Sequence, residues 1–152
     1  MKRKKVSLLM VENNSIMIEA TIMLYDMSKD FQFEYFIVKS ETEMNDFLEN
    51  NKVDLVLCDF RLLSNEGLLN IPNIQKKTRM VIRENLINDN IIKQGLMHGA
   101  SCVHAKGMEA NVLFSMYKQV LEGKIFEFEE LKKINNSPSE FFNFFKMEKL
   151  SV

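Results

Sequence analysis

Three charged residues are the best candidates for chemistry in this chain, because each directly follows a short apolar run. Asp59 ends the run VDLVLCD, Glu12 follows VSLLMV, and Lys106 follows SCVHA. Two carboxylates that converge on a lysine perturb one another's pKa, and such groups are typical of functional sites. For Asp59 taken alone, the plainer interpretation is a turn residue that ends a strand.

The elements that would position these residues are buried parallel strands. Short runs of Leu and Val without polar alternation indicate strands that are covered on both faces, as in a parallel sheet between helices. The carboxyl ends of such strands share one edge of the sheet, where ligands bind in open α/β folds. We therefore expect the residues that end four of the strands to meet at that edge. They are Glu12 with Asn13, Asp59, Arg83 or Glu84, and Lys106.

Strand and helix patterns alternate five times along the chain. Apolar runs predict strands at 6–11, 33–38, 53–59, 79–82 and 101–104. Helical periods predict helices at 15–27, 40–48, between Gly67 and Pro72, 89–97 and 109–121. Five strands alternating with five helices predict an α/β domain, in which a parallel sheet carries helices on both faces.

The helix boundaries carry signals of their own. Asn14 or Ser15 can cap the first helix, and the sequence SETE (40–43) has the capping-box pattern. Gly99 is suited to end the helix at 89–97, because glycine readily takes the left-handed conformation at helix C-termini.

Length and charge describe one globular domain with a short appendage. The chain has 152 residues, a formal net charge of -1 and 27% charged residues, which gives it no general attraction to nucleic acids or membranes. Its apolar runs are too short for a signal peptide or a membrane span, so we expect a cytoplasmic protein. The basic run KRKK (2–5) is interpreted as a leader to the first strand rather than as a binding arm.

Several catalytic and metal-binding classes lack their residues. Cys58 and Cys102 lie in predicted buried strands, as reduced cysteines often do, and form no CxxC pair that would hold zinc. His98 and His104 have no Ser or Cys partner for a hydrolase triad. The loop ENNS (12–15) lacks the sequence that cradles phosphate in enzymes of related fold. We therefore expect no catalytic residues and no enzyme activity.

Three segments of the chain together resemble the receiver domain of two-component response regulators. They are VENN (11–14), LVLCDFRL (55–62) with Gly67, and GASCVHAKG (99–107). The resemblance covers residues 6–123, which leaves a basic leader at 1–5 and a helical extension or linker at 124–152. It implies a doubly wound sheet with strand order 2-1-3-4-5. It also implies that a histidine kinase phosphorylates the central Asp, with one Mg²⁺ bound by acids and a backbone carbonyl.

Transferred position by position, the resemblance makes Asp59 the phosphoacceptor, Lys106 the lysine that pairs with phosphate, and Glu12 the first acid. The residues at the metal-binding positions are Glu12, Asn13, Asp59 and, through its backbone carbonyl, Arg61.

Other positions depart from the family. Asn13 stands where the family has its main metal-binding Asp, and an amide brings no charge. Arg83 or Glu84 stands where a Thr or Ser is expected, and Val103 replaces the aromatic switch residue. Leu62 and Gly107 replace the prolines that commonly follow the acceptor and the lysine.

These departures change the charge of the pocket. The family's usual three carboxylates and one lysine attract Mg²⁺, whereas Glu12, Asp59 and Lys106 leave less negative charge here. If Arg83 points inward, its guanidinium can fork onto Asp59 in the place of the metal. We therefore interpret the chain as a receiver with weak or absent Mg²⁺ binding and phosphorylation that acts through protein contacts.

Other interpretations of the pocket stay open at this point. Asp59 is a working phosphoacceptor in one of them. In a second, the charged residues persist as a buried ion cluster that serves stability only. A third is a structural adaptor whose output does not change when Asp59 is replaced.

The extension is rich in aromatic residues, since half of the chain's twelve phenylalanines follow residue 125. A short helix is expected to end near Asn135 and Asn136, and Ser137 to Glu140 has the signals of another helix start. So much aromatic surface is expected to pack onto the receiver, to form a homodimer, or to bind a partner protein. The last receiver helix, at 109–121, is a second candidate for a homodimer contact.

The final residues LSV (150–152) resemble the linker that joins a receiver to a helix-turn-helix output domain. This resemblance implies an alternative: a conventional phosphoacceptor receiver that forms the N-terminal part of a DNA-binding transcription regulator. Nothing in the 152 residues themselves is expected to bind DNA.

Overall fold

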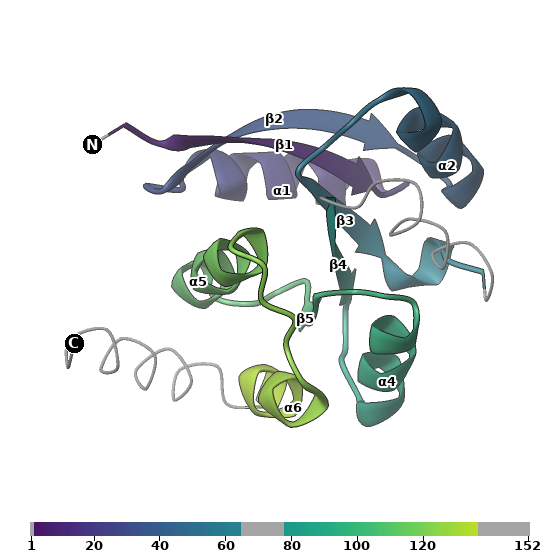
Figure 1. Ribbon diagram of the computed structural model, residues 1–152, viewed down its shortest axis with the longest axis vertical. Helices are drawn as coiled ribbons and strands as arrows, with labels where there is room; N and C mark the ends of the chain where they lie inside the picture. Colours follow the sequence, from purple (N-terminus) through teal and green to yellow (C-terminus); the bar gives the residue numbers. More distant parts are fainter. Residues whose placement is uncertain (1, 65–77, 137–152) are drawn as a thin grey trace.

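A computed structural model describes residues 2–64 and 78–136 of the chain. Its core is a sheet of five strands that all pair in parallel, in the order β2-β1-β3-β4-β5 (Figure 1). The strands are β1 (Lys4–Val11), β2 (Phe31–Val38), β3 (Leu55–Asp59), β4 (Arg79–Glu84) and β5 (Cys102–Ala105). The predicted fold class and strand order are both confirmed.

Strand β3 lies in the middle of the sheet and is buried along its whole length. This burial explains its apolar sequence LVLC, because side chains on both faces of the strand meet helices instead of water. At the edge of the sheet, β2 instead alternates buried Phe31 and Phe33 with exposed Gln32 and Glu34. The contrast between the two strands reflects their positions in the sheet.

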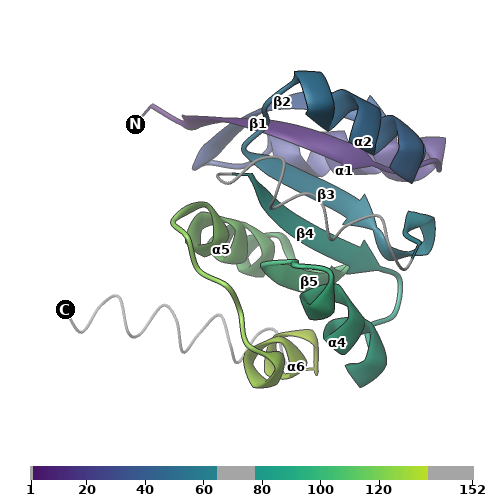
Figure 2. The ribbon, with the colours of Figure 1, turned by 45° about the vertical axis from the view of Figure 1, so that its right-hand side comes forward.

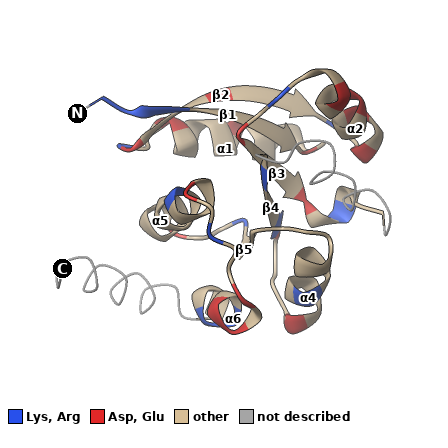
Figure 3. Ribbon diagram, viewed as in Figure 1, with Lys and Arg blue, Asp and Glu red and all other residues tan. Residues whose placement is uncertain are grey.

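Strand β1 begins two residues before its predicted start. Its backbone pairs with β2 from Lys4 opposite Phe31 onward, while the side chains of Lys4 and Lys5 stay exposed. Figure 3 shows this basic beginning of the strand in blue. The apolar pattern began only at Val6 and therefore missed the two lysines, because backbone pairing at a strand end does not require buried side chains.

Helices cover both faces of the sheet. They are α1 (Ser15–Asp26), α2 (Glu41–Asn50), α4 (Asp89–Met97) and α5 (Ala110–Leu121), with a short 3-10 helix η1 (Phe60–Leu62) directly after β3. Helices α1 and α5 lie on one face, and α2 and α4 lie on the other (Figures 1 and 2).

The predicted helix caps are present. The Asn14 side chain accepts a hydrogen bond from the Met17 amide, and Ser40 accepts one from the Glu43 amide. The Glu43 carboxylate reaches back to the Lys39 amide, one residue earlier than in a standard capping box. Gly99 has a φ of 90°, which is the left-handed conformation expected after α4.

The beginning of the extension folds back on the domain. Helix α6 (Phe128–Asn136) lies beside α4 and the outer strand β5 (Figure 2). The expected short helix is present, and of the three alternatives for the aromatic extension this part of it packs onto the domain. The predicted helix start at 137–140, the later phenylalanines and the segment from Gly67 to Pro72 lie outside the described residues. Across 2–64 and 78–136, every helix is too short or too polar to span a membrane.

Candidate functional site

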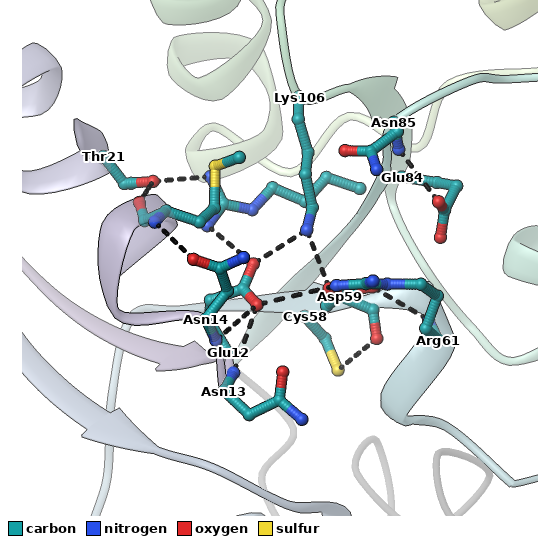
Figure 4. A network of polar contacts seen from close by, with 12 residues as sticks. Glu12, Asn13, Asn14, Thr21, Cys58, Asp59, Arg61, Glu84, Asn85 and Lys106 are labelled. Carbon is teal, nitrogen blue, oxygen red and sulfur yellow. Dashed lines mark hydrogen bonds and ion pairs between the residues drawn. The ribbon is translucent and has the colours of Figure 1, made fainter. Parts of the chain in front are cut away.

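Three strand ends bring charged side chains into direct contact. The Lys106 ammonium lies 2.9 Å from Glu12 Oε1 and 2.7 Å from Asp59 Oδ2. Figure 4 shows the lysine reaching between the two carboxylates, both of which are fully buried. The expected meeting of these residues at one edge of the sheet is confirmed. Two further cations join them, and the set Glu12, Asp59, Arg61, Arg83 and Lys106 is called the pocket cluster below.

Arg61 binds Asp59 through both its backbone and its side chain. The backbone amide donates to Asp59 Oδ1 at 2.9 Å, since Asp59 caps η1 and Arg61 is the second residue of that turn. The guanidinium then folds back, with Nη2 at 2.7 Å and Nε at 3.2 Å from Oδ2. The resemblance implied a role only for the backbone carbonyl of Arg61, as a metal ligand. A long cation two residues after a capping Asp is the signal that could have pointed to this fork.

Arg83 is turned inward, but the expectation that it forks onto Asp59 is wrong. Its Nη1 donates to Thr21 Oγ1 at 2.9 Å, and Nη2 lies 3.6 Å from Glu12 Oε1. Arg83 stands directly opposite Asp59 in the β3–β4 register, yet its side chain runs under α1, where Thr21 and Glu12 receive it. The guanidinium is only 3% exposed, which makes it a buried counterion of Glu12.

The other predicted positions lie outside these contacts. Glu84 is half-buried, and its Oε1 accepts a hydrogen bond from the Asn85 amide. Asn13 is exposed and contributes its backbone amide to Glu12 Oε2 at 3.1 Å. Val103 is fully buried and faces α4, where its side chain approaches Gly95. Arg83 and Glu84 both lie in the last part of β4, which extends two residues beyond its predicted end, and Arg83 is therefore the one of the two that reaches the cluster.

No protein-family model and no curated protein matches the chain, but solved structures do. A LuxR-family two-component response regulator from Aurantimonas sp. SI85-9A1 matches with a TM-score of 0.72 and 15% identity, over 86% of this chain and 97% of that one. A CheY-like receiver domain from Methanospirillum hungatei JF-1 matches with a TM-score of 0.65 and 18% identity, over 80% and 95%. A LuxR-family regulator from Silicibacter pomeroyi gives 0.63 and 23%, over 80% and 96%.

This chain has the fold of a response regulator receiver domain. In that fold the pocket cluster occupies the carboxyl edge of the sheet, with Asp59 at the end of the central strand. Identities of 11 to 23% to such structures concern the fold, so the chemistry of the receiver pocket is argued from the residues of this chain.

Charge at the receiver pocket is dominated by cations. Burial by itself raises the pKa of Asp59, but hydrogen bonds from Arg61 and Lys106 outweigh it and hold the pKa at about 2. The same contact with Asp59 raises the pKa of Arg61. At neutral pH, two carboxylates therefore face three cationic side chains. A usual receiver pocket has the opposite balance.

A divalent cation does not fit this arrangement of donors. Mg²⁺ takes oxygen ligands that carry negative charge, and it binds carboxylates that are free to face it. Here both Asp59 oxygens receive donors from Arg61. Glu12 Oε1 receives Lys106 and Oε2 receives two backbone amides. Within the described ranges, no group of three metal-ligating side chains comes together.

A second polar group lies behind the pocket, between α1 and α5. Tyr25 and Tyr117 join their hydroxyls at 2.6 Å, and Tyr117 lies 2.8 Å from His104 Nε2. His104 Nδ1 lies 2.8 Å from the Ala105 carbonyl, which can only accept, so Nδ1 carries the proton and Nε2 accepts from Tyr117. Burial lowers the pKa of His104 to about 4. This chain of hydrogen bonds was not predictable from the sequence, because its only signal is the presence of tyrosines at core positions of helices.

Proposed function

We propose that this chain is a signalling module on the receiver fold that acts through protein contacts, without a metal-dependent phosphorylation cycle. The observation that carries the proposal is the occupied state of Asp59: Arg61 and Lys106 already bind the carboxylate that would accept a phosphoryl group. Its role is binding rather than catalysis, and we place the module in the cytoplasm.

The electrostatics support this function. A phosphoacceptor carboxylate must present an oxygen to an incoming phosphoryl group whose charge is neutralised by a metal. Arg61 and Lys106 neutralise Asp59 directly, and the excess of cations over carboxylates opposes the approach of Mg²⁺. Binding of Mg²⁺ is therefore weak, and the conformation with Asp59 neutralised is the standing state of the module.

An exposed apolar stripe supports a protein partner. Ile16 and Met23 of α1 are 79% and 72% exposed and share one face of the helix with exposed Ala20, and the C-cap residue Met27, 76% exposed, continues this face. The charged residues of this helix are Glu19 and Asp26. A partner helix with an apolar stripe and basic flanks fits this surface. The helices of a histidine kinase are one such partner.

A small phosphodonor such as acetyl phosphate, given with Mg²⁺ and followed by intact mass, tests the proposal. We expect no mass increase in the wild type, and a measurable phosphorylated fraction in Arg61→Ala, which removes the guanidinium from Asp59 and lowers the positive charge of the pocket cluster. Asp59→Asn combined with Arg61→Ala is the control for the site of addition. A stoichiometric phosphoryl group on wild-type Asp59 would contradict the proposal.

A second candidate is the conventional phosphoacceptor at the N-terminal part of a DNA-binding regulator. The half-exposed side chain of Arg61 favours it, because a guanidinium that is 50% exposed can turn into solvent. Several of the similar structures are LuxR-family regulators, two of them described as DNA-binding. This candidate predicts phosphorylation of the wild type in the same experiment.

A further inference from the structure

The outer edge of β5 is closed by the segment that follows α5. Three backbone groups of this edge point away from β4 and find partners in the segment. The Ser101 carbonyl accepts from the Phe126 amide at 2.9 Å, and the Val103 carbonyl accepts from Asn135 Nδ2 at 3.0 Å. The Ala105 amide donates to Asn135 Oδ1 at 3.1 Å.

Asn135 takes the place of one residue of a further strand. In a parallel ladder, a residue donates to the carbonyl before its neighbour and accepts from the amide after it. The Asn135 amide does both around His104. Strand β5 has the sequence CVHA, without the charged residues or proline that usually keep an open strand edge from pairing. Protection of this edge therefore depends on α6.

The contact of α6 with the rest of the domain resembles a protein–protein interface, with an apolar centre and a polar rim. Phe126, Leu131 and Ile134 are at most 1% exposed and form the apolar centre of the contact. Its rim is polar and exposed: Lys132 lies 3.7 Å from Asp89 of α4, and Lys93 lies over the Phe128 ring. Rim pairs of this kind contribute little energy, so the apolar centre and the Asn135 bonds hold the helix in place.

Two consecutive residues, Ala105 and Lys106, connect the covered strand edge to the pocket cluster. Ala105 holds Asn135 through its amide, and its carbonyl accepts from His104. Lys106 follows at once, and its ammonium binds Asp59 and Glu12. A movement of Lys106 in response to the charge of Asp59 would thus act on the backbone that binds α6.

We propose that α6 is a cover of the β5 edge whose docking is controlled by the pocket cluster through Lys106 and Ala105. This inference rests on the proposed function, for which it names the output: loss of the contact between Lys106 and Asp59 loosens α6 and uncovers a strand edge. On the uncovered edge, the carbonyls of Ser101 and Val103 and the amide of Ala105 are free to pair with the backbone of an extended segment.

Hydrogen exchange of the Ala105 amide in the full chain tests the cover. We expect exchange in Asn135→Ala to be faster than in the wild type by roughly tenfold or more, because the acceptor of that amide is removed. Asn136→Ala, one residue further along the same helix, is the matched control and should leave exchange unchanged. The exchange of β3 amides reports on global stability. If the Ala105 amide exchanges in Asn135→Ala at its wild-type rate relative to β3, the proposal that α6 covers the β5 edge is wrong.

Asp59→Asn tests the control by the pocket. This substitution removes one of the two charges that hold Lys106 but keeps the shape of the side chain, and we expect faster exchange at Ala105 relative to β3. If Asp59→Asn leaves the exchange of Ala105 relative to β3 at its wild-type value, the pocket cluster does not control the docking of α6. Arg61→Ala leaves both the Asp59 charge and its contact with Lys106 in place, so it is the matched control and should keep the ratio at its wild-type value. Phosphorylation is read separately by mass, so a wild type that accepts phosphate disproves the proposed function without deciding the role of α6.

Discussion

Two cationic side chains, Arg61 and Lys106, bind the carboxylate of Asp59. Arg61 reaches Asp59 through a fork of side-chain donors and through its own amide, which is a geometry that lysine cannot reproduce. Because half of the Arg61 side chain is exposed, its contribution is weakened by solvent and salt. The buried Lys106, 4% exposed, is the firmer partner of Asp59.

The pKa of Asp59 predicts a loss of stability in acid. Its folded-state pKa, about 2, lies below the usual value of 3.8. The unfolded chain therefore binds the proton more readily, and stability is present above pH 4 and is lost as the pH falls towards 2. The loss is on the order of 2 kcal/mol. Denaturant unfolding between pH 5 and 2 should show this slope in the wild type and not in Asp59→Asn. Asp46→Asn, on the exposed side of α2, should keep it.

The titration of His104 changes the stability of the protein in a different pH range. Its folded-state pKa of about 4 lies below the usual 6.5, because burial disfavours the charged ring. Stability is therefore complete above pH 6.5 and is lost as the pH falls from there towards 4, by on the order of 3 kcal/mol at most. His104→Gln should remove the dependence in this range, whereas His98→Gln should retain it. An unchanged slope in His104→Gln would show that another group titrates.

At the scale of elements, α4 approaches β5 closely because it carries a glycine. A Cβ added to Gly95 would lie 2.6 Å from Cγ2 of Val103 and 3.5 Å from Cδ1 of Ile82. Val103 is fully buried in β5 and cannot move away without disturbing the sheet. The glycine thus fixes the spacing between the helix and the strand that also binds α6.

We predict that Gly95→Ala destabilises the protein although alanine favours helices. The gain in helix propensity is about 1 kcal/mol, and the forced repacking costs roughly 1–3 kcal/mol. Combining Gly95→Ala with Val103→Ala should recover part of that loss, since the contact is relieved. A double-mutant cycle by denaturant unfolding measures this coupling. Additive effects of the two substitutions would mean that the two residues do not press on each other.

The elements were predictable from the sequence to the extent that burial determines residue type. Apolar runs located all five strands, and the caps at Asn14 and Ser40 located two helix starts. The predicted pocket residues Glu12, Asp59 and Lys106 did meet, because strand direction alone brings their backbones together.

The directions of the two arginines were not predictable. A guanidinium on a long side chain can reach several acceptors, and the choice depends on neighbours from other elements. Thr21 of α1 draws Arg83 away from Asp59, and the turn of η1 brings Arg61 to it. The residue pattern of a single strand predicts neither the acceptor of Arg83 nor that of Arg61.

At the scale of the whole molecule, the layer between α1, α5 and the sheet is unusually polar. Arg83 joins Glu12, directly after β1, to Thr21 of α1, and the two tyrosines join α1 and α5 to His104 of β5. Each of these groups is buried, so each contact compensates a desolvation cost rather than adding net stability. Such networks specify one arrangement of the layers, since a shifted helix would leave buried polar atoms without partners.

The direction of the hydrogen bonds predicts unequal effects for the two tyrosines. Because His104 Nε2 accepts from Tyr117, the Tyr117 oxygen accepts from Tyr25. Tyr117→Phe leaves both the Tyr25 hydroxyl and the His104 nitrogen without this partner, whereas Tyr25→Phe removes only the first donor of the chain. We expect Tyr117→Phe to cost roughly 2–4 kcal/mol and Tyr25→Phe about 1 kcal/mol.

Equilibrium unfolding of the two variants and of the double variant compares these costs. In the double variant the Tyr25 hydroxyl is absent as well, so it should be less destabilised than the sum of the single substitutions. If Tyr25→Phe costs as much stability as Tyr117→Phe, the hydrogen bonds run in the opposite direction, from His104 through Tyr117 to Tyr25. The proton of His104 would then sit on Nε2, and the ring could not donate to the Ala105 carbonyl that adjoins Lys106.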